Sequence, residues 1–266
     1  LKTRLFGGEA PDIMMLQSYS TIFEYAQEGF LADLTNEAFM ENIVNAAKKS
    51  VTYEGKAYAL PLDMAGIGVV YNKDLFAKLG LEIPKTYSEL KNVCKVISDN
   101  GFTPFALSIR ESWPLGHFIS MAHTASIGDK LDAWLAEMNA GTGTFASEEM
   151  DKMFEVFDFF KANGGDKAME MDYNSSLNNF ASGSYGMMVQ GLWAYGAAMK
   201  LNPTLNAGFF PFPFSDDPEQ TKLYVDTDST LAISATAPKE NIEAAKLFLN
   251  FLTSEEGVQL VVEKFK

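Results

Sequence analysis

Short apolar runs along the chain alternate with longer stretches in which apolar residues recur every three or four positions. The short runs are typical of buried strands and lie at 13–16, 66–71, 185–190 and 231–233. The longer stretches predict amphipathic helices, most clearly at 147–163 and 239–252. Because strands and helices alternate throughout, the pattern predicts an α/β fold with mostly parallel or mixed sheets.

Capping residues mark the ends of several predicted helices. Asn72 is expected to cap one helix, and Gly80 to end it. Thr86 and Glu89 have the spacing of a capping box, in which each side chain accepts a hydrogen bond from the other residue's backbone N–H. The helix that starts there is expected to bury Cys94 on its inner face.

Other segments carry weaker signals, which the structure can test. A single helix is predicted over 36–49 and a strand over 104–109. The proline-rich segment 209–214 suits an edge strand or a loop, because proline cannot donate to a central ladder. At helical spacing, Phe154 and Phe248 are expected on the buried faces of their helices.

Composition adds mainly exclusions. The 266 residues carry 21 Lys and Arg against 35 Asp and Glu, a net charge of −14, so phosphates would be repelled and nucleic acid is not expected as a partner. With Cys94 as the only cysteine, no intramolecular disulfide is possible. There is neither an apolar run long enough to span a membrane nor a signal-peptide pattern. Both ends fall at helical patterns, so we expect a fragment of a longer chain.

Signatures of catalysis and of metal or phosphate binding are scarce. The sequence contains no HExxH, GxSxG or GxxxxGK[ST] motif. His117 and His123 fit no zinc spacing and are interpreted as structural residues. Asp226-x-Asp228-x-Thr230 begins like a calcium loop but lacks the turn glycine and the final glutamate. We therefore expect no catalytic residue, no metal ion and no cofactor.

Polar and aromatic side chains gather instead at the ends of the predicted strands. Ligands of α/β proteins bind at the carboxyl ends of strands, so these residues form the candidate binding site. They include two of the three tryptophans of the chain, with carboxylates and amides around them. The candidates are Gln17, Ser18, Tyr19, Asp63, Met64, Arg110, Glu111, Trp113, Gln190, Trp193, Asp226 and Asp228.

This combination of side chains has the chemistry of a carbohydrate site. Flat aromatic faces bind the C–H faces of a pyranose ring, while carboxylates and amides bind pairs of hydroxyl groups. Structural alternatives stay open for single residues. Trp113 and Trp193 could be core residues, Glu111 could form a surface ion pair, and Asp226 and Asp228 could belong to turns or caps.

A series of motifs runs in a characteristic order along essentially the whole chain. The motifs are Gly8-Glu-Ala-Pro-Asp-Ile13, Tyr25-Ala-Gln-Glu-Gly-Phe-Leu-Ala-Asp-Leu-Thr35, Tyr53-Glu-Gly-Lys-Ala-Tyr-Ala-Leu-Pro61, Val70-Tyr-Asn-Lys-Asp-Leu-Phe76, Pro84-Lys-Thr-Tyr-Ser-Glu-Leu90, Phe180-Ala-Ser-Gly183, Met188-Val-Gln-Gly-Leu-Trp193 and Ala244-Ala-Lys-Leu-Phe-Leu-Asn-Phe-Leu252. Their order resembles that of the extracellular sugar-binding proteins of bacterial ABC importers, the maltose-binding-protein-like family.

The resemblance implies a two-lobed, periplasmic-binding-protein-like fold of type II, with hinge strands between the lobes. It places residues 1–61 in lobe one, 62–228 in lobe two and 229–266 in a return segment of lobe one. In relatives, the sugar faces the segments that match Gln17–Tyr19, Asp63–Met64, Glu111–Trp113 and Trp193.

The resemblance also implies a function without catalysis. The protein would be the substrate-binding component of an ABC importer, capturing a carbohydrate, here an oligosaccharide, between two lobes and delivering it to the transmembrane permease. It would work in an extracellular or periplasmic location, where a lipid anchor upstream of Leu1 would hold it at the cell surface. Two alternatives stay open: a glycoside hydrolase with Asp226 and Asp228 as its carboxylate pair, and a sugar sensor with the same lobes.

Overall fold

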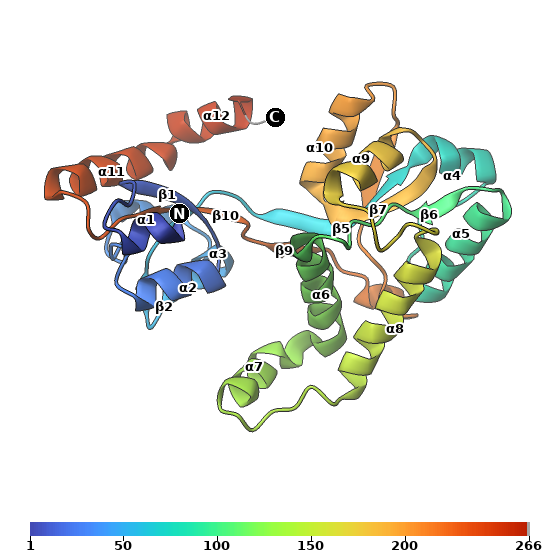
Figure 1. Cartoon of the computed structure of the whole chain (residues 1–266), viewed down its shortest axis with the longest axis horizontal. Helices are drawn as coiled ribbons and strands as arrows, with labels where there is room; N and C mark the ends of the chain where they lie inside the picture. Colours follow the sequence, from blue (N-terminus) through green and yellow to red (C-terminus); the bar gives the residue numbers. More distant parts are fainter. Residues whose placement is uncertain (265–266) are drawn as a thin grey trace. The chain divides into compact units, whose positions relative to one another are not determined.

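The computed structural model describes residues 1–264, which divide into two compact units (Figure 1). Unit 1 contains residues 1–65 and 225–264, and unit 2 contains residues 66–224. Residues 265 and 266, the last two of the predicted return segment, lie outside the described residues. Each unit combines helices with β-sheet, so the predicted α/β class is confirmed. The assignment of lobes stays a prediction.

Unit 1 is built on a three-stranded antiparallel sheet in the order β1-β10-β4. Its register pairs Ile13 with Ile233 and Gln17 with Ser229, so the end of β1 lies beside the start of β10. A separate hairpin joins β2 to β3. The elements are α1 (Lys2–Phe6), β1 (Ile13–Gln17), α2 (Ser20–Gln27), η1 (Ala38–Asn42), α3 (Asn45–Lys49), β2 (Thr52–Tyr53), β3 (Lys56–Ala57), β4 (Leu60–Pro61), β10 (Ser229–Ile233), α11 (Lys239–Leu252) and α12 (Glu255–Lys264).

The core of unit 1 covers one face of this sheet. Met14 and Leu16 on β1 are buried, whereas Met15 between them is 67% exposed. The run 13–16 is therefore a half-buried strand, and its prediction as a buried one is wrong in this respect. The reason is that an antiparallel sheet needs cover on one face only.

Unit 2 contains a five-stranded mixed sheet. Four strands follow the order β6-β7-β5-β8, and β9 pairs with β5. In this path only the β6–β7 pair is parallel, so the sheet of unit 2 is mixed, as expected. The sheet of unit 1 is antiparallel, which differs from the expectation. The elements are β5 (Ala65–Asn72), α4 (Lys73–Leu79), α5 (Tyr87–Asp99), β6 (Thr103–Phe105), α6 (Ser112–Ile127), η2 (Gly128–Lys130), α7 (Leu131–Asn139), α8 (Glu148–Asn163), α9 (Tyr173–Ala181), β7 (Tyr185–Gly191), α10 (Leu192–Leu201), β8 (Ala207–Phe210) and η3 (Pro218–Gln220). Strand β9 (Tyr224–Asp226) crosses the boundary between the units after Tyr224.

The helix caps of unit 2 lie where the sequence predicts them. The Asn72 side chain accepts a hydrogen bond from the backbone N–H of Leu75, and Gly80 ends α4 with φ +65°. Thr86 and Glu89 form the reciprocal capping box of α5. The caps depend on neighbours in sequence alone, which is why local reasoning succeeds here.

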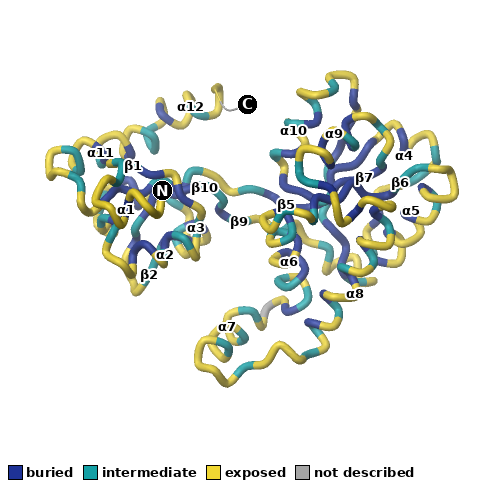
Figure 2. Tube along the Cα trace, in the orientation of Figure 1, coloured by how far each residue is buried: buried dark blue, intermediate teal, exposed yellow. Residues whose placement is uncertain are grey.

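The buried interior of unit 2 follows the central strands β5 and β7, dark blue in Figure 2. Nearly all of β5 is buried, because helices or loops cover both faces of a central strand. The proline-rich segment 209–214 begins in β8, the end strand of the path, which pairs with β5. The chain leaves the sheet after Phe210, so the prediction of an edge strand or loop is confirmed.

Several sequence expectations are wrong in detail. The helix predicted over 36–49 is split into η1 and α3, because Ile43 and Val44 are extended and β-branched residues favour that conformation. The strand predicted over 104–109 is confined to Thr103–Phe105. Phe154 and Phe248 are 59% and 46% exposed, so neither faces its core.

Two helices of unit 2, α6 and α7, have no counterpart in the sequence prediction. Helix α6 is apolar around most of its circumference and contains Pro114 in its first turn, where the missing N–H is tolerated. Within the described chain, α7 has no buried residue at all. Neither helix therefore carries the one-sided apolar stripe by which a helix is recognised.

No helix in residues 1–264 combines the length and the apolar character that crossing a bilayer requires.

The single thiol provides a test of the packing of α5. Cys94 is 1% exposed, and its burial raises the pKa of the thiol well above its ordinary value. Because the thiolate is the reactive form, we expect the native protein to react with Ellman's reagent far more slowly than the protein unfolded in guanidinium. A thiol that titrates fully in the native state would contradict the buried inner face of α5.

Candidate functional site

The candidate residues divide between the two units. Seven belong to unit 1, where they surround the end of β1 and the start of β10; we call them the β1/β10 group: Gln17, Ser18, Tyr19, Asp63, Met64, Asp226 and Asp228. Five belong to unit 2, around the start of α6 and the end of β7: Arg110, Glu111, Trp113, Gln190 and Trp193.

Strand pairing brings the β1/β10 group together. The backbone N–H of Ser18 donates to the carbonyl of Asp228 over 3.3 Å, just beyond the last register pair of β1 and β10. The Ser18 hydroxyl donates to the carbonyl of Thr227 over 2.6 Å. Residues more than two hundred positions apart thus meet because the end of one antiparallel strand lies beside the start of the other.

Tyr19 is held in an uncommon backbone conformation. Its φ is +57°, a region that residues other than glycine rarely adopt, and its N–H donates to the carbonyl of Ser50. The phenol donates to Asp226 Oδ1 over 2.8 Å. Burial, together with this bond, raises the pKa of Tyr19, so the hydroxyl stays a protonated donor. Tyr19 is still 38% exposed, which leaves part of its ring open to a ligand.

The carboxylates of the β1/β10 group also organise the backbone. Asp63 Oδ1 accepts hydrogen bonds from the backbone N–H groups of Asp228 and Ser229, at 3.2 and 3.1 Å. Asp226, the last residue of β9, accepts at Oδ1 from the N–H of the next residue, Thr227, over 2.8 Å. Gln17 and Met64 are exposed beside these groups.

Unit 2 carries four aromatic rings in succession, which we call the aromatic row: Tyr173, Trp113, His117 and Trp193. Ring centroids lie 5.0 Å apart for Tyr173 and Trp113, 5.8 Å for Trp113 and His117, and 5.4 Å for His117 and Trp193. The rings are tilted or edge-to-face, the preferred geometries for aromatic pairs. Trp113 is 39% exposed, so it is not a core residue.

Three helix starts position the row. Trp113 and His117 lie one turn apart on α6, Tyr173 begins α9, and Trp193 is the second residue of α10. The Glu111 carboxylate, at the N-cap of α6, accepts the backbone N–H of Tyr173 over 2.6 Å. Glu111 therefore joins the starts of α6 and α9, which holds Trp113 and Tyr173 in contact.

The end of β7 positions Trp193. The indole lies over Gly191, at which a Cβ atom would overlap the ring. Trp193 is partly buried and packs against the apolar clusters on both sides of the sheet, so it contributes to the core and to the surface. Gln190 is 2% exposed and donates from Nε2 to the hydroxyl of Ser108 over 3.0 Å. Its Oε1 has no hydrogen-bond partner among the described residues.

The expectation of a satisfied structural residue is wrong for His123, whose Nε2 is buried without a hydrogen-bond partner within residues 1–264. His117 packs between Trp113 and Trp193 in the aromatic row. Tyr173 is not among the candidate residues that the sequence indicates. The spacing of Trp113 and His117 places both on one helical face, but that signal is usable only once α6 is recognised as a helix.

Both groups offer side chains suited to binding. Across residues 1–264, no group of three or more His, Cys, Asp or Glu side chains could hold a metal ion. The aromatic row offers apolar ring faces beside the carboxylate of Glu111, and the β1/β10 group offers carboxylates and hydroxyls. These are the two kinds of surface that a polyhydroxylated ring compound contacts.

Two relatives are sugar-binding proteins by name. The chain is 26% identical to the multiple sugar-binding protein of Streptococcus mutans, over 97% of this chain and 62% of the relative. It is 27% identical to the diacetylchitobiose binding protein of Streptomyces coelicolor, over 96% of this chain and 59% of the relative. The chain thus spans about three fifths of the length of these relatives.

Solved structures with the same fold are solute-binding proteins. The raffinose complex of the solute-binding protein RafE matches with a TM-score of 0.82 at 26% identity, covering 97% of this chain and 68% of that one. Its ligand-free form, from Streptococcus pneumoniae, matches with a TM-score of 0.79. The predicted type II solute-binding fold class is confirmed.

The family profile described as bacterial extracellular solute-binding protein matches residues 1–259. This match covers nearly the whole chain and confirms the resemblance inferred from the order of its motifs. The chain therefore belongs to the bacterial extracellular solute-binding protein family.

Proposed function

We propose that this chain is the carbohydrate-binding part of the substrate-binding component of a bacterial ABC importer. It captures a sugar outside the cytoplasmic membrane, in the extracellular or periplasmic location typical of its family, and delivers it to the transmembrane permease. The observation that carries the proposal is the aromatic row of unit 2, with the Glu111 carboxylate beside it. Attachment through a lipid anchor stays a prediction.

The aromatic row supports recognition of a sugar by its faces. A pyranose ring has apolar C–H faces and polar edges, so an indole takes the face while carboxylates bind the hydroxyls at the edge. Trp113 supplies the more exposed indole and Trp193 the more buried one. Several rings in succession provide more than one stacking surface, which favours an oligosaccharide over a single sugar. The raffinose in the RafE complex is a ligand of this kind.

The β1/β10 group supports recognition of hydroxyls. The Tyr19 phenol and the Asp226 carboxylate already form a hydrogen-bonded pair whose geometry the strand pairing determines. A preformed pair of this kind loses little conformational entropy when a sugar hydroxyl joins it. We propose that Gln17, Ser18, Asp63, Met64 and Asp228 contribute contacts or hold this pair in place.

Both aspartates of the hydrolase alternative take part in hydrogen bonds within the β1/β10 group. Asp226 accepts from the Tyr19 hydroxyl and the Thr227 amide. The backbone N–H of Asp228 donates a hydrogen bond to Asp63 Oδ1. We propose that both residues organise the site and that the protein binds sugar without cleaving it.

The tryptophans provide the main test of the proposal. We expect calorimetric titration of the chain with a panel of neutral oligosaccharides, raffinose and N,N′-diacetylchitobiose among them, to identify a ligand. Trp113→Ala and Trp193→Ala should each weaken its binding by about tenfold or more, because a stacking face is lost; tenfold corresponds to about 1.4 kcal/mol.

The third tryptophan of the chain is the matched control. Trp134 lies on α7, in contact with His123 and Phe145 rather than with the aromatic row. Trp134→Ala should therefore leave the affinity unchanged. Binding of another class of solute, with no response to any sugar, would refute the carbohydrate assignment.

Gly191 tests whether the position of Trp193 matters. Its φ and ψ of −74° and 167° suit any residue, so alanine strains no backbone, but the new Cβ would displace the indole. We expect Gly191→Ala to weaken sugar binding at least as much as Trp193→Ala, measured by calorimetry. Gly196 lies within α10, and a Cβ added there would meet open space, so Gly196→Ala should keep full affinity. If Gly191→Ala bound the sugar as tightly as Gly196→Ala does, the position of the Trp193 ring would be unimportant.

The absence of catalysis is tested by prolonged incubation with the oligosaccharide that binds. We expect no reducing ends to accumulate, because the protein is proposed to bind the sugar without cleaving it. Reducing ends that do accumulate, and disappear in Asp228→Asn, would favour the glycoside hydrolase instead.

A further inference from the structure

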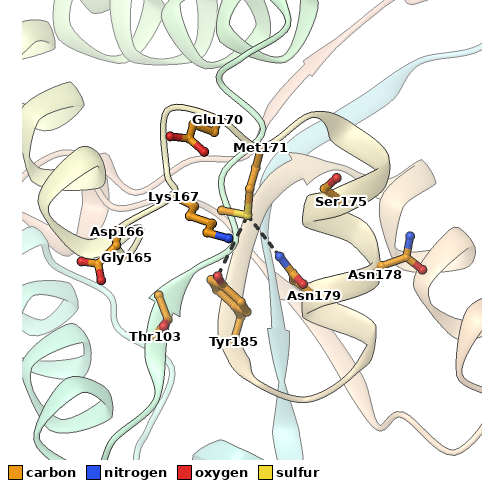
Figure 3. A pocket seen from close by; sticks show the side chains of 10 residues that line it. All are labelled: Thr103, Gly165, Asp166, Lys167, Glu170, Met171, Ser175, Asn178, Asn179 and Tyr185. Atoms are coloured by element: carbon orange, nitrogen blue, oxygen red, sulfur yellow. Dashed lines mark hydrogen bonds between the residues drawn. The ribbon is translucent and has the colours of Figure 1, made fainter.

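We propose that unit 2 contains a second carbohydrate-binding site, in a cavity of about 680 Å³ that shares no residue with the aromatic row or with the β1/β10 group (Figure 3). Its volume lies within the range of about 300–1,000 Å³ typical of small-molecule sites. The proposal goes beyond the function proposed above, because it concerns a different ligand position. The lining residues that carry the argument are Asp166, Lys167, Glu170, Met171, Asn179 and Tyr185.

Three parts of the fold enclose the cavity. Thr103 and Tyr185 come from β6 and β7, which form a parallel pair, and β6 is the end strand of the path β6-β7-β5-β8. The connection between α8 and α9 supplies Gly165 to Met171, and one face of α9 supplies Asn179. The tertiary structure therefore gathers polar side chains from segments far apart in sequence at one edge of the sheet.

Two good hydrogen-bond donors converge on a poor acceptor inside this cavity. The Asn179 amide donates to the Met171 sulfur over 3.1 Å, and the Tyr185 hydroxyl donates to the same sulfur over 4.0 Å. A thioether is a weak acceptor, so neither donor is well satisfied. The Lys167 side chain points toward the same place (Figure 3). A ligand oxygen near the sulfur would give all three groups a stronger partner.

The cavity also contains hydrogen-bond acceptors, the carboxylates of Asp166 and Glu170. Asp166 and Glu170 line the cavity, and neither forms an ion pair within residues 1–264; the same is true of Lys167. Lys167 supplies a donor and the two carboxylates supply acceptors, a combination that suits hydroxyl groups because each hydroxyl both donates and accepts. The two carboxylates outnumber the one ammonium, in a chain of net charge −14, which disfavours an anion. A neutral sugar is the ligand class that satisfies both conditions.

Met171 offers a direct probe of the cavity. We would label the methionine methyl groups of the full chain with ¹³C, assign Met171 by Met171→Leu, and titrate with neutral sugars: glucose, galactose, raffinose and N,N′-diacetylchitobiose. The proposal expects the Met171 signal to shift and saturate with at least one of them. Lys167→Ala and Asn179→Ala should weaken this response by about tenfold, the usual effect of losing a hydrogen bond to a charged or buried group.

Control variants separate this proposal from the first. Lys161→Ala removes an exposed lysine from α8 outside the cavity and should leave the Met171 response unchanged. Trp193→Ala, which should impair the aromatic row, should also leave it unchanged, and a Met171 response retained in that variant supports an independent site. The other Met signals of each variant report whether it is folded.

Three results would overturn the proposal. The first is a Met171 signal that no sugar in the panel shifts. The second is a signal that shifts only with galacturonate or inorganic phosphate, which would make the cavity an anion site. The third is a response lost in Trp193→Ala, which would show that Met171 senses ligand at the aromatic row.

Discussion

The antiparallel pairing of β1 with β10 is the constraint on which the organisation of the chain depends. It joins residues 13–17 to residues 229–233, and the Thr230 hydroxyl adds a bond to the carbonyl of Leu16. Both ends of the described chain therefore belong to one unit, and residues 66–224 must form a core of their own. The same register brings Ser18 and Tyr19 beside residues 226–228. One ladder of backbone hydrogen bonds thus determines both the division of the chain and the composition of the β1/β10 group.

The two groups of candidate residues differ in how far their polar atoms are already engaged. In the β1/β10 group, Tyr19, Asp63 and Asp226 all have partners within the unit, so a ligand would have to join or replace those bonds. In the aromatic row, the Trp113 indole is 39% exposed, so part of its ring is open to a ligand. Burial of apolar ring area is then the natural source of affinity, and the engaged polar groups are the natural source of orientation and specificity.

Buried polar atoms without partners lie close to both groups. Gln190 Oε1 lies two residues before the start of α10, and Thr227 Oγ1 lies between the two aspartates of the β1/β10 group; neither has a partner within residues 1–264. Leaving such an atom unpaired costs about 1–3 kcal/mol. Sites tolerate this cost more often than cores do, because a ligand can provide the missing bond.

Neighbouring residues alone predict the local features: the Asn72 cap, the capping box of Thr86 and Glu89, and the buried face of α5 with Cys94. These depend on residues three or four positions apart, so a pattern reveals them. Three features depend on contacts between distant segments: the break in the helix predicted over 36–49, the helix at 112–127, and the packing of His117 and Tyr173 against Trp113. Local preferences leave several conformations of these segments nearly equal in free energy, and strand register and side-chain packing select one of them.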